Sequence, residues 1–132
     1  MIRRPHTEGS WPELHALAEA EVGDVVRGLP PDIAALANQV PVVFEAAPSH
    51  ELVADGLPPD TLGLFVGVDY ASAESGVQPE SPTQIHLYLE NLWFYARRNR
   101  PHFREEVRIT YLHELGHFLG LDEDELADRD MD

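Results

Sequence analysis

Apolar residues recur with helical spacing near the N-terminus of this chain. Ser10 to Glu13 has the residue types of a helix start: a capping serine, a proline in the first turn and a glutamate three positions after the serine. Apolar residues then keep to one helical face until Gly28, after which two consecutive prolines end the pattern. The pattern predicts a helix from about Ser10 to Gly28 and a short second helix over residues 32–38.

The middle of the chain has the alternation and the β-branched residues that are typical of strands. Three such segments are predicted, over residues 40–45, 61–68 and 84–89. The first contains Pro41, which favours a strand start or a sheet edge because proline cannot donate a hydrogen bond to a neighbouring strand. Residues 48–60 and 69–82 are rich in proline, glycine and polar side chains and are predicted to be loops.

Two further helices are predicted in the last third of the chain. The first covers residues 90–98, and the second begins near His102 and keeps an apolar face as far as Leu119. Gly120 can adopt the left-handed backbone conformation that commonly ends a helix. No internal repeat is visible, and 132 residues fit one domain of ordinary size, so a single domain spanning residues 1–132 is expected.

The chain contains no cysteine and carries a formal net charge of −15. Cysteine-based zinc fingers, iron–sulfur clusters and thiol catalysis are therefore excluded, and any bound metal must rely on His, Asp or Glu. The nine Lys and Arg residues are spread along the sequence, which argues against a nucleic-acid partner. No secretory signal or bilayer-length apolar segment is visible, so a cytoplasmic protein without a membrane partner is expected. Acidic residues concentrate near the C-terminus, where a solvated tail is expected from about residue 124.

The most specific chemical pattern is His113-Glu114-Leu115-Gly116-His117, an HExxH sequence in the last predicted helix. Two histidines four positions apart on a helix project from the same face, so both imidazoles can reach one Zn²⁺ ion. A chain of this composition contains HExxH by chance in about 4% of cases, and the added glycine at 120 and acid at 123 lower that figure to about 0.05%. The extended pattern therefore favours a zinc site with one ion per chain over a solvated helix face.

A catalytic zinc site needs three protein ligands and one open position, and HExxH supplies two of the ligands. Gly120 lets the chain turn sharply after the helix, so a carboxylate three residues later can return toward the imidazoles. Glu123 is the predicted third ligand, and Asp124 and Asp122 are alternatives, in that order. Glu114 is the predicted general base, which takes a proton from the water that zinc activates.

His86 and Tyr88 share the polar face of the strand predicted over residues 84–89. If that strand borders the cleft of a hydrolase, either side chain can donate a hydrogen bond to a developing oxyanion. A polar strand face is more often simply hydrated surface, and this second interpretation is favoured.

Together these segments resemble the short bacterial zincin-like metallopeptidases, single-domain proteins with a minimal metzincin-type motif near the C-terminus. The similarity rests on His113 to Gly120 and on four weaker segments, Leu29-Pro30-Pro31, Val42-Val43-Phe44, residues 62–68 and Ile85-His86-Leu87-Tyr88. It implies an α+β fold in which a small mixed sheet packs against an N-terminal helix and a C-terminal active-site helix. It also implies zinc bound at His113 and His117.

The resemblance and the motif predict a zinc-dependent metallopeptidase that hydrolyses peptide bonds in peptides or unstructured protein substrates. The alternative is a catalytically weak or inactive module of the same fold that binds a metal or a partner. Larger metzincins carry His or Asp at the position of Glu123 and add a methionine turn, and these differences favour the alternative. The intact Glu114 favours the enzyme, because holding zinc does not require a glutamate at that position.

Overall fold

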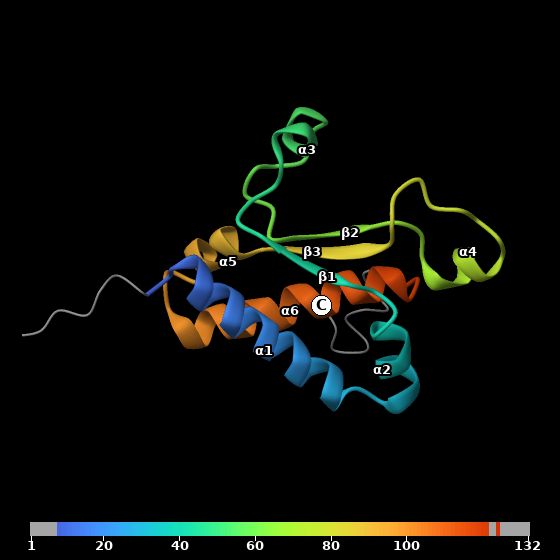
Figure 1. The fold of residues 1–132 in the computed structure, drawn as a ribbon, viewed down its shortest axis with the longest axis horizontal. Coiled ribbons are helices and arrows are strands. Elements are labelled where there is room, and N and C mark those ends of the chain that lie inside the picture. Colours follow the sequence, from blue (N-terminus) through green and yellow to red (C-terminus); the bar gives the residue numbers. More distant parts are fainter. Residues whose placement is uncertain (1–7, 122–123, 125–132) are drawn as a thin grey trace, which may run out of the picture.

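A computed structural model describes residues 8–121 and residue 124 of the chain, and this part is an α+β structure with three strands and six helices (Figure 1). The α+β class expected from the sequence is therefore confirmed. Every helix in the described ranges is too short or too polar to cross a bilayer. In chain order the elements are α1 (Trp11–Gly28), α2 (Pro31–Ala37), β1 (Val42–Glu45), α3 (His50–Ala54), β2 (Gly63–Val66), α4 (Tyr70–Glu74), β3 (Gln84–Tyr88), α5 (Leu89–Tyr95) and α6 (Arg100–Phe118).

The three strands form one mixed sheet in the order β1-β3-β2. The central strand β3 runs parallel to β1 and antiparallel to β2, so that Leu87 lies between Phe44 on one side and Gly63 on the other. Ile85 and Leu87 are fully buried, and His86 between them points to the opposite face of the sheet. The outer position of β1 agrees with the edge that Pro41 predicts.

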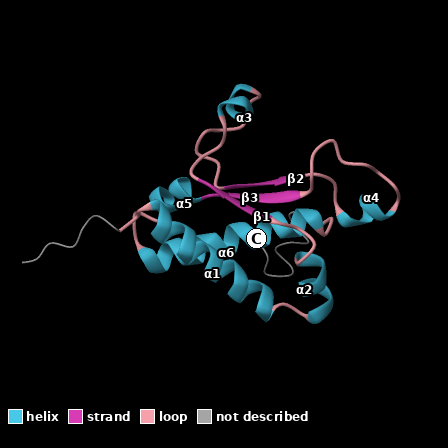
Figure 2. Ribbon diagram, viewed as in Figure 1, coloured by secondary structure: helices cyan, strands magenta, loops and turns pink. Residues whose placement is uncertain are grey.

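Helices α1 and α6 lie along one face of this sheet, and α5 follows β3 directly at the end of the sheet, where it contacts both helices (Figure 2). α6 contacts both β2 and β3, and α1 runs beside α6 with the side chains of Leu14 and Ala18 buried in the core. From α5, Trp93 packs edge-on against Phe103 of α6, with ring centroids 5.8 Å apart. The apolar face that the sequence assigns to each of these helices is the face that builds the core.

The connections on either side of β2 contain two short helices that the sequence does not predict. α3 and α4 occupy segments that the proline, glycine and polar residues predict to be loops, so the prediction is wrong at these turns. Each is started by a local cap: Ser49 Oγ accepts a hydrogen bond from the Leu52 N–H at 3.2 Å, and Asp69 Oδ1 accepts one from the Ser72 N–H at 2.7 Å. Five residues are too few to show an apolar period.

The capping contacts place the starts of α1 and α6 close to the predicted positions, whereas the helix predicted to reach Arg98 ends at Tyr95, because Arg97 and Arg98 both have a φ of +58°. Ser10 caps α1, because its Oγ accepts the Glu13 N–H at 3.4 Å. A strict capping box would also have the Glu13 carboxylate accept the N–H of Ser10, but here it accepts the N–H of Gly9. α6 begins at Arg100, two residues earlier than predicted, because Asn99 Oδ1 accepts the His102 N–H at 3.0 Å. The helix therefore carries one more half-turn ahead of the motif.

Candidate metal centre

His113, Glu114 and His117 lie within little more than one turn of α6 and direct their polar atoms toward one another. The ligand atoms of the three side chains lie within 4.8 Å of one another, and the two histidine Nε2 atoms are 3.2 Å apart. The imidazole rings meet nearly edge to face, with an interplanar angle of 83°. Within residues 8–121 and 124, this is the group of His, Asp and Glu side chains compact enough to share one ion.

The spacing of the two imidazoles fits a zinc ion. A tetrahedral ion with Zn–N bonds of 2.0–2.1 Å places two nitrogen ligands about 3.3 Å apart. The observed Nε2–Nε2 distance of 3.2 Å is close to that value. Two half-buried imidazoles and a carboxylate are also the donor types that zinc prefers in a site without cysteine. The side chains present therefore suit the ion that the motif predicts.

The buried face of α6 fixes the direction in which these side chains point. Phe103, Val107, Tyr111 and Leu115 follow at four-residue intervals, and each is at most 1% exposed. Residues four apart share one side of a helix, so these four side chains all face the core. His113 is two positions from both Tyr111 and Leu115, so it lies on the other side of the helix, away from the core. Burial also raises the pKa of the Tyr111 hydroxyl to about 12.

The first residue of β2 approaches the motif at very short range. A Cβ atom added to Gly63 would lie 2.5 Å from Thr110 Cγ2 and 3.4 Å from Glu114 Cγ. The strand can therefore reach the helix beside Glu114 only because this position has no side chain. Sequence reasoning missed Gly63 as a positioning residue, although a glycine inside a strand pattern is a recognised sign of close backbone approach.

A cavity of about 340 Å³ opens next to the motif. His113 and Glu114 form one part of its wall, and Leu62, Tyr95, Glu106 and Ile109 form others. A volume at the lower end of the usual range for small ligands fits a short stretch of an extended chain, not a folded domain. His113 and Glu114 are therefore accessible from this side.

The turn after α6 has the geometry that the sequence predicts. Gly120 has a φ of +79°, its N–H bonds to the carbonyl of His117, and the Leu121 N–H bonds to the carbonyl of Gly116, each at 3.0 Å. These two bonds form a Schellman motif, which ends a helix and redirects the chain. The predicted third ligand, Glu123, and the alternative Asp122 lie outside the described residues. The other alternative, Asp124, is exposed and stands apart from the group of three.

His86 and Tyr88 lie on the sheet face opposite to the one that contacts α6. His86 Nδ1 lies 2.5 Å from Glu45 Oε1, and its Nε2 lies 3.0 Å from Gln84 Oε1, so the imidazole is engaged on its own face. Tyr88 is fully buried, so the expectation of a hydrated strand face is wrong at this residue. Burial, and secondarily the nearby Glu45 carboxylate, raises the pKa of Tyr88. The sheet separates both side chains from His113 and Glu114, so the geometry gives no support to a role in binding an oxyanion there.

Comparison with known proteins gives one match that covers most of the chain. The family model described as zincin-like metallopeptidase matches residues 37–132, which include the whole sheet and the His113–His117 motif. A search among curated proteins found no match. Because the matched region is more than half of the sequence and contains the three side chains described above, the chain belongs to the zincin-like metallopeptidase family.

Proposed function

We propose that this chain is a zinc-dependent peptidase in which His113 and His117 bind one zinc ion per chain and Glu114 is the general base. The observation that carries the proposal is the 3.2 Å separation of the two Nε2 atoms, with the Glu114 carboxylate in the same group. A carboxylate after the Gly120 turn completes the ligand set, and Glu123 remains the preferred residue. The family membership supports a hydrolase that acts on peptide bonds.

Bound zinc would supply a Lewis acid that polarises the carbonyl of the peptide bond and acidifies water. His113 and His117 hold it through their Nε2 atoms, which requires both rings to be neutral and makes binding weaker in acid. A Glu114 carboxylate oxygen accepts a proton from the attacking water and then donates it to the leaving amine nitrogen.

The outer edge of β2, which pairs with no other strand in the described part of the chain, offers a place for the substrate backbone. β2 is an outer strand of the sheet, and its first residue, Gly63, lies against Glu114. An extended peptide can add to such an edge as a further strand through backbone hydrogen bonds. This arrangement would bring a peptide bond to the group of three and restricts the substrate to peptides and unstructured segments of proteins.

Two substitutions separate metal binding from catalysis. His113→Ala should lose the single zinc found by metal analysis of protein purified without a chelator. Glu114→Gln should keep the zinc and abolish cleavage of an unstructured protein, because the amide cannot accept the proton. Absence of zinc in the wild-type protein would contradict the proposal. A zinc-loaded wild-type protein that cleaves nothing across a broad peptide panel would favour the alternative, a non-catalytic binding module.

The third ligand is tested by a matched pair of variants. Glu123→Ala and Asp124→Ala remove a carboxylate from neighbouring positions and change the net charge equally. Zinc affinity should fall about 10-fold or more in the first and remain close to that of the wild type in the second. The reverse order would assign the ligand to Asp124.

A further inference from the structure

The cavity beside the motif contains one carboxylate that the proposed reaction does not use. Glu106 lies on α6 two turns before His113, so the two residues share one side of the helix and are about 10 Å apart along its axis. The Glu106 side chain is only 15% exposed, and its ion pair with His102 spans 3.5 Å, which is longer than a hydrogen bond. A largely buried carboxylate therefore faces the cavity beyond the reacting centre.

Apart from Gly63 and Thr110, the residues that line the cavity between Glu106 and the motif are apolar or aromatic. Leu62 and Ile109 form two of the walls, and Tyr95, a residue that is 59% exposed, contributes an aromatic ring. Long basic side chains have this same division, with an apolar stem and a charged end. The two helical turns between Glu106 and His113 can be spanned by an extended Lys or Arg side chain together with the Glu106 side chain, when the substrate backbone is held near His113.

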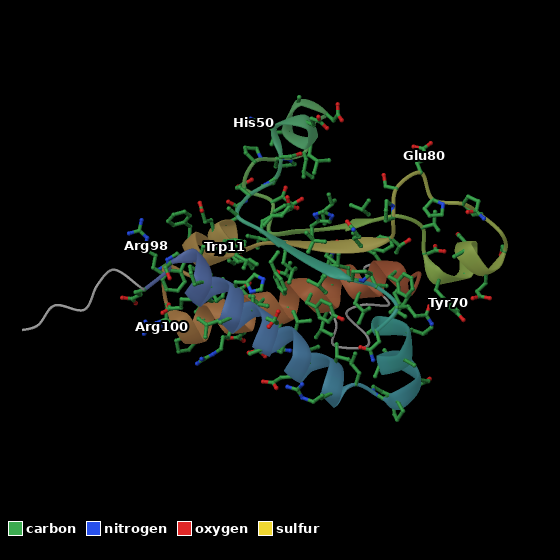
Figure 3. The ribbon with its side chains drawn as sticks, viewed as in Figure 1. Trp11, His50, Tyr70, Glu80, Arg98 and Arg100 are labelled. Atoms are coloured by element: carbon green, nitrogen blue, oxygen red, sulfur yellow. The ribbon has the colours of Figure 1, made fainter. Side chains whose placement is uncertain are left out.

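The region around the cavity favours positive charge. A second cavity of about 290 Å³ shares Leu62 and Tyr95 with the first and adds the carboxylate of Asp60 and the ring of Phe94. The chain's own Arg98, at the end of the molecule where α5 ends (Figure 3), places its guanidinium 5.1 Å from the centre of that Phe94 ring. The Phe94 ring therefore already makes a cation–π contact with a guanidinium. The net charge of −15 adds a general attraction for cations.

We propose that Glu106 binds a basic side chain of the substrate, so that the enzyme prefers peptides with Arg or Lys close to the cleaved bond. This proposal rests on the peptidase function proposed above, and it names the substrate class for the same site. Arg is favoured over Lys, because a guanidinium can donate two hydrogen bonds to one carboxylate and can also stack on Tyr95. Glu106 acts in this role as a specificity residue.

The first test measures binding without catalysis. Zinc-loaded Glu114→Gln protein is titrated into fluorescein-labelled peptides that differ at one central residue, Arg, Lys, Met or Glu, and anisotropy gives the Kd. We expect the Arg peptide to bind about 10-fold more tightly than the Met peptide. Adding Glu106→Gln should remove this preference, and Glu106→Lys should favour the Glu peptide. The matched control is Glu105→Gln, an exposed neighbour that does not line the cavity and loses the same charge.

The second test maps cleavage sites of the wild-type enzyme in a peptide library by mass spectrometry. We expect Arg and Lys to be enriched at one fixed position within two residues of the cleaved bond, and the enrichment to disappear in Glu106→Gln but not in Glu105→Gln. Cleavage without enrichment would overturn the inference and leave the peptidase intact. Glu106-dependent binding of Arg peptides without any cleavage would support the basic site and contradict the peptidase. Equal binding of the Arg and Met peptides would overturn the inference whatever the cleavage result.

Discussion

Gly63 allows β2 to lie against α6 because it has no side chain. A Cβ at this position would lie 2.5 Å from Thr110 Cγ2, a distance that side chains do not tolerate without movement. We expect Gly63→Ala to lower the free energy of unfolding by about 1–3 kcal/mol, the usual cost of overpacking. Because Glu114 lies against the same position, peptide hydrolysis should fall more than stability alone explains. Urea titration and a peptide-cleavage assay measure the two effects.

A second substitution tests whether the contact with Thr110 is the cause. Thr110→Ser removes the methyl group that the new Cβ would meet, so the double variant Gly63→Ala/Thr110→Ser should regain part of the lost stability. Gly28→Ala is the control, because no atom lies within 4 Å of a Cβ placed there. Additive effects of the two substitutions at positions 63 and 110 would show that the strain lies elsewhere.

At the scale of the element, the end of α6 depends on the backbone of Gly120. Its φ of +79° strains any residue that has a Cβ, while the nearest atom to such a Cβ, Asp69 Oδ2, is at an ordinary 3.9 Å. The cost of Gly120→Ala is therefore one of backbone conformation, and we expect the free energy of unfolding to fall by about 1 kcal/mol. Gly120→Asn should cost less, because asparagine tolerates this conformation. Equal losses in the two variants, by urea titration, would contradict this explanation.

The elements that the sequence predicts well are those whose signals are local. The period of apolar residues predicts α1 and α6, alternation predicts β3, and Gly120 predicts the turn. The HExxH spacing likewise predicts that the imidazoles of His113 and His117 come together, because the geometry of one helix is enough to decide it. Helices α3 and α4 are not predicted, because they are short and their capping residues, Ser49 and Asp69, are of the types that also occur in the polar turns of loops.

The remaining features of the site depend on contacts between residues far apart in the sequence. Gly63 meets Thr110 and Glu114 only because β2 pairs with β3 and the sheet then packs on α6. Glu106 becomes a cavity wall only when Tyr95 and Leu62 are brought opposite to it. No periodicity in the chain encodes these pairings. A single sequence can therefore predict the group of side chains within one helix more readily than the residues that other elements bring to the cavity.

At the scale of the whole molecule, α1 lies outside the residues that match the family, yet it runs along α6, which carries the HExxH motif. A bidentate pair joins the starts of the two helices: Arg100 Nε donates to Glu13 Oε1 and Nη2 donates to Oε2, each at 3.1 Å. Figure 3 shows Arg100 and Trp11 at the same end of the molecule. The hydrogen bond from Arg100 is the main reason that the pKa of Glu13 is held below its usual range.

The pair should stabilise the fold in a pH-dependent way. A carboxyl whose pKa is lower in the folded state contributes stability above its unfolded pKa of about 4.3, and this contribution is lost as the pH falls through the folded pKa. We therefore expect Arg100→Gln to lower the Tm by up to about 3 °C at pH 7, since partly exposed pairs contribute little. The difference from wild type should shrink steadily below about pH 4 as Glu13 becomes protonated.

A stability measurement at low pH, where Glu13 is protonated, is the sharper test of the Arg100–Glu13 pair. Once Glu13 is neutral, Arg100 is only a cation in the first turn of α6, where the helix dipole disfavours positive charge. Arg100→Gln should then be as stable as the wild type or slightly more stable, so the sign of the difference reverses with pH. Arg27→Gln is the matched control, because Arg27 pairs with Asp24 within α1 on an exposed surface and joins no two helices. A loss in Arg100→Gln that is the same at pH 7 and pH 3 would mean that the arginine stabilises the protein through packing of its stem and not through Glu13.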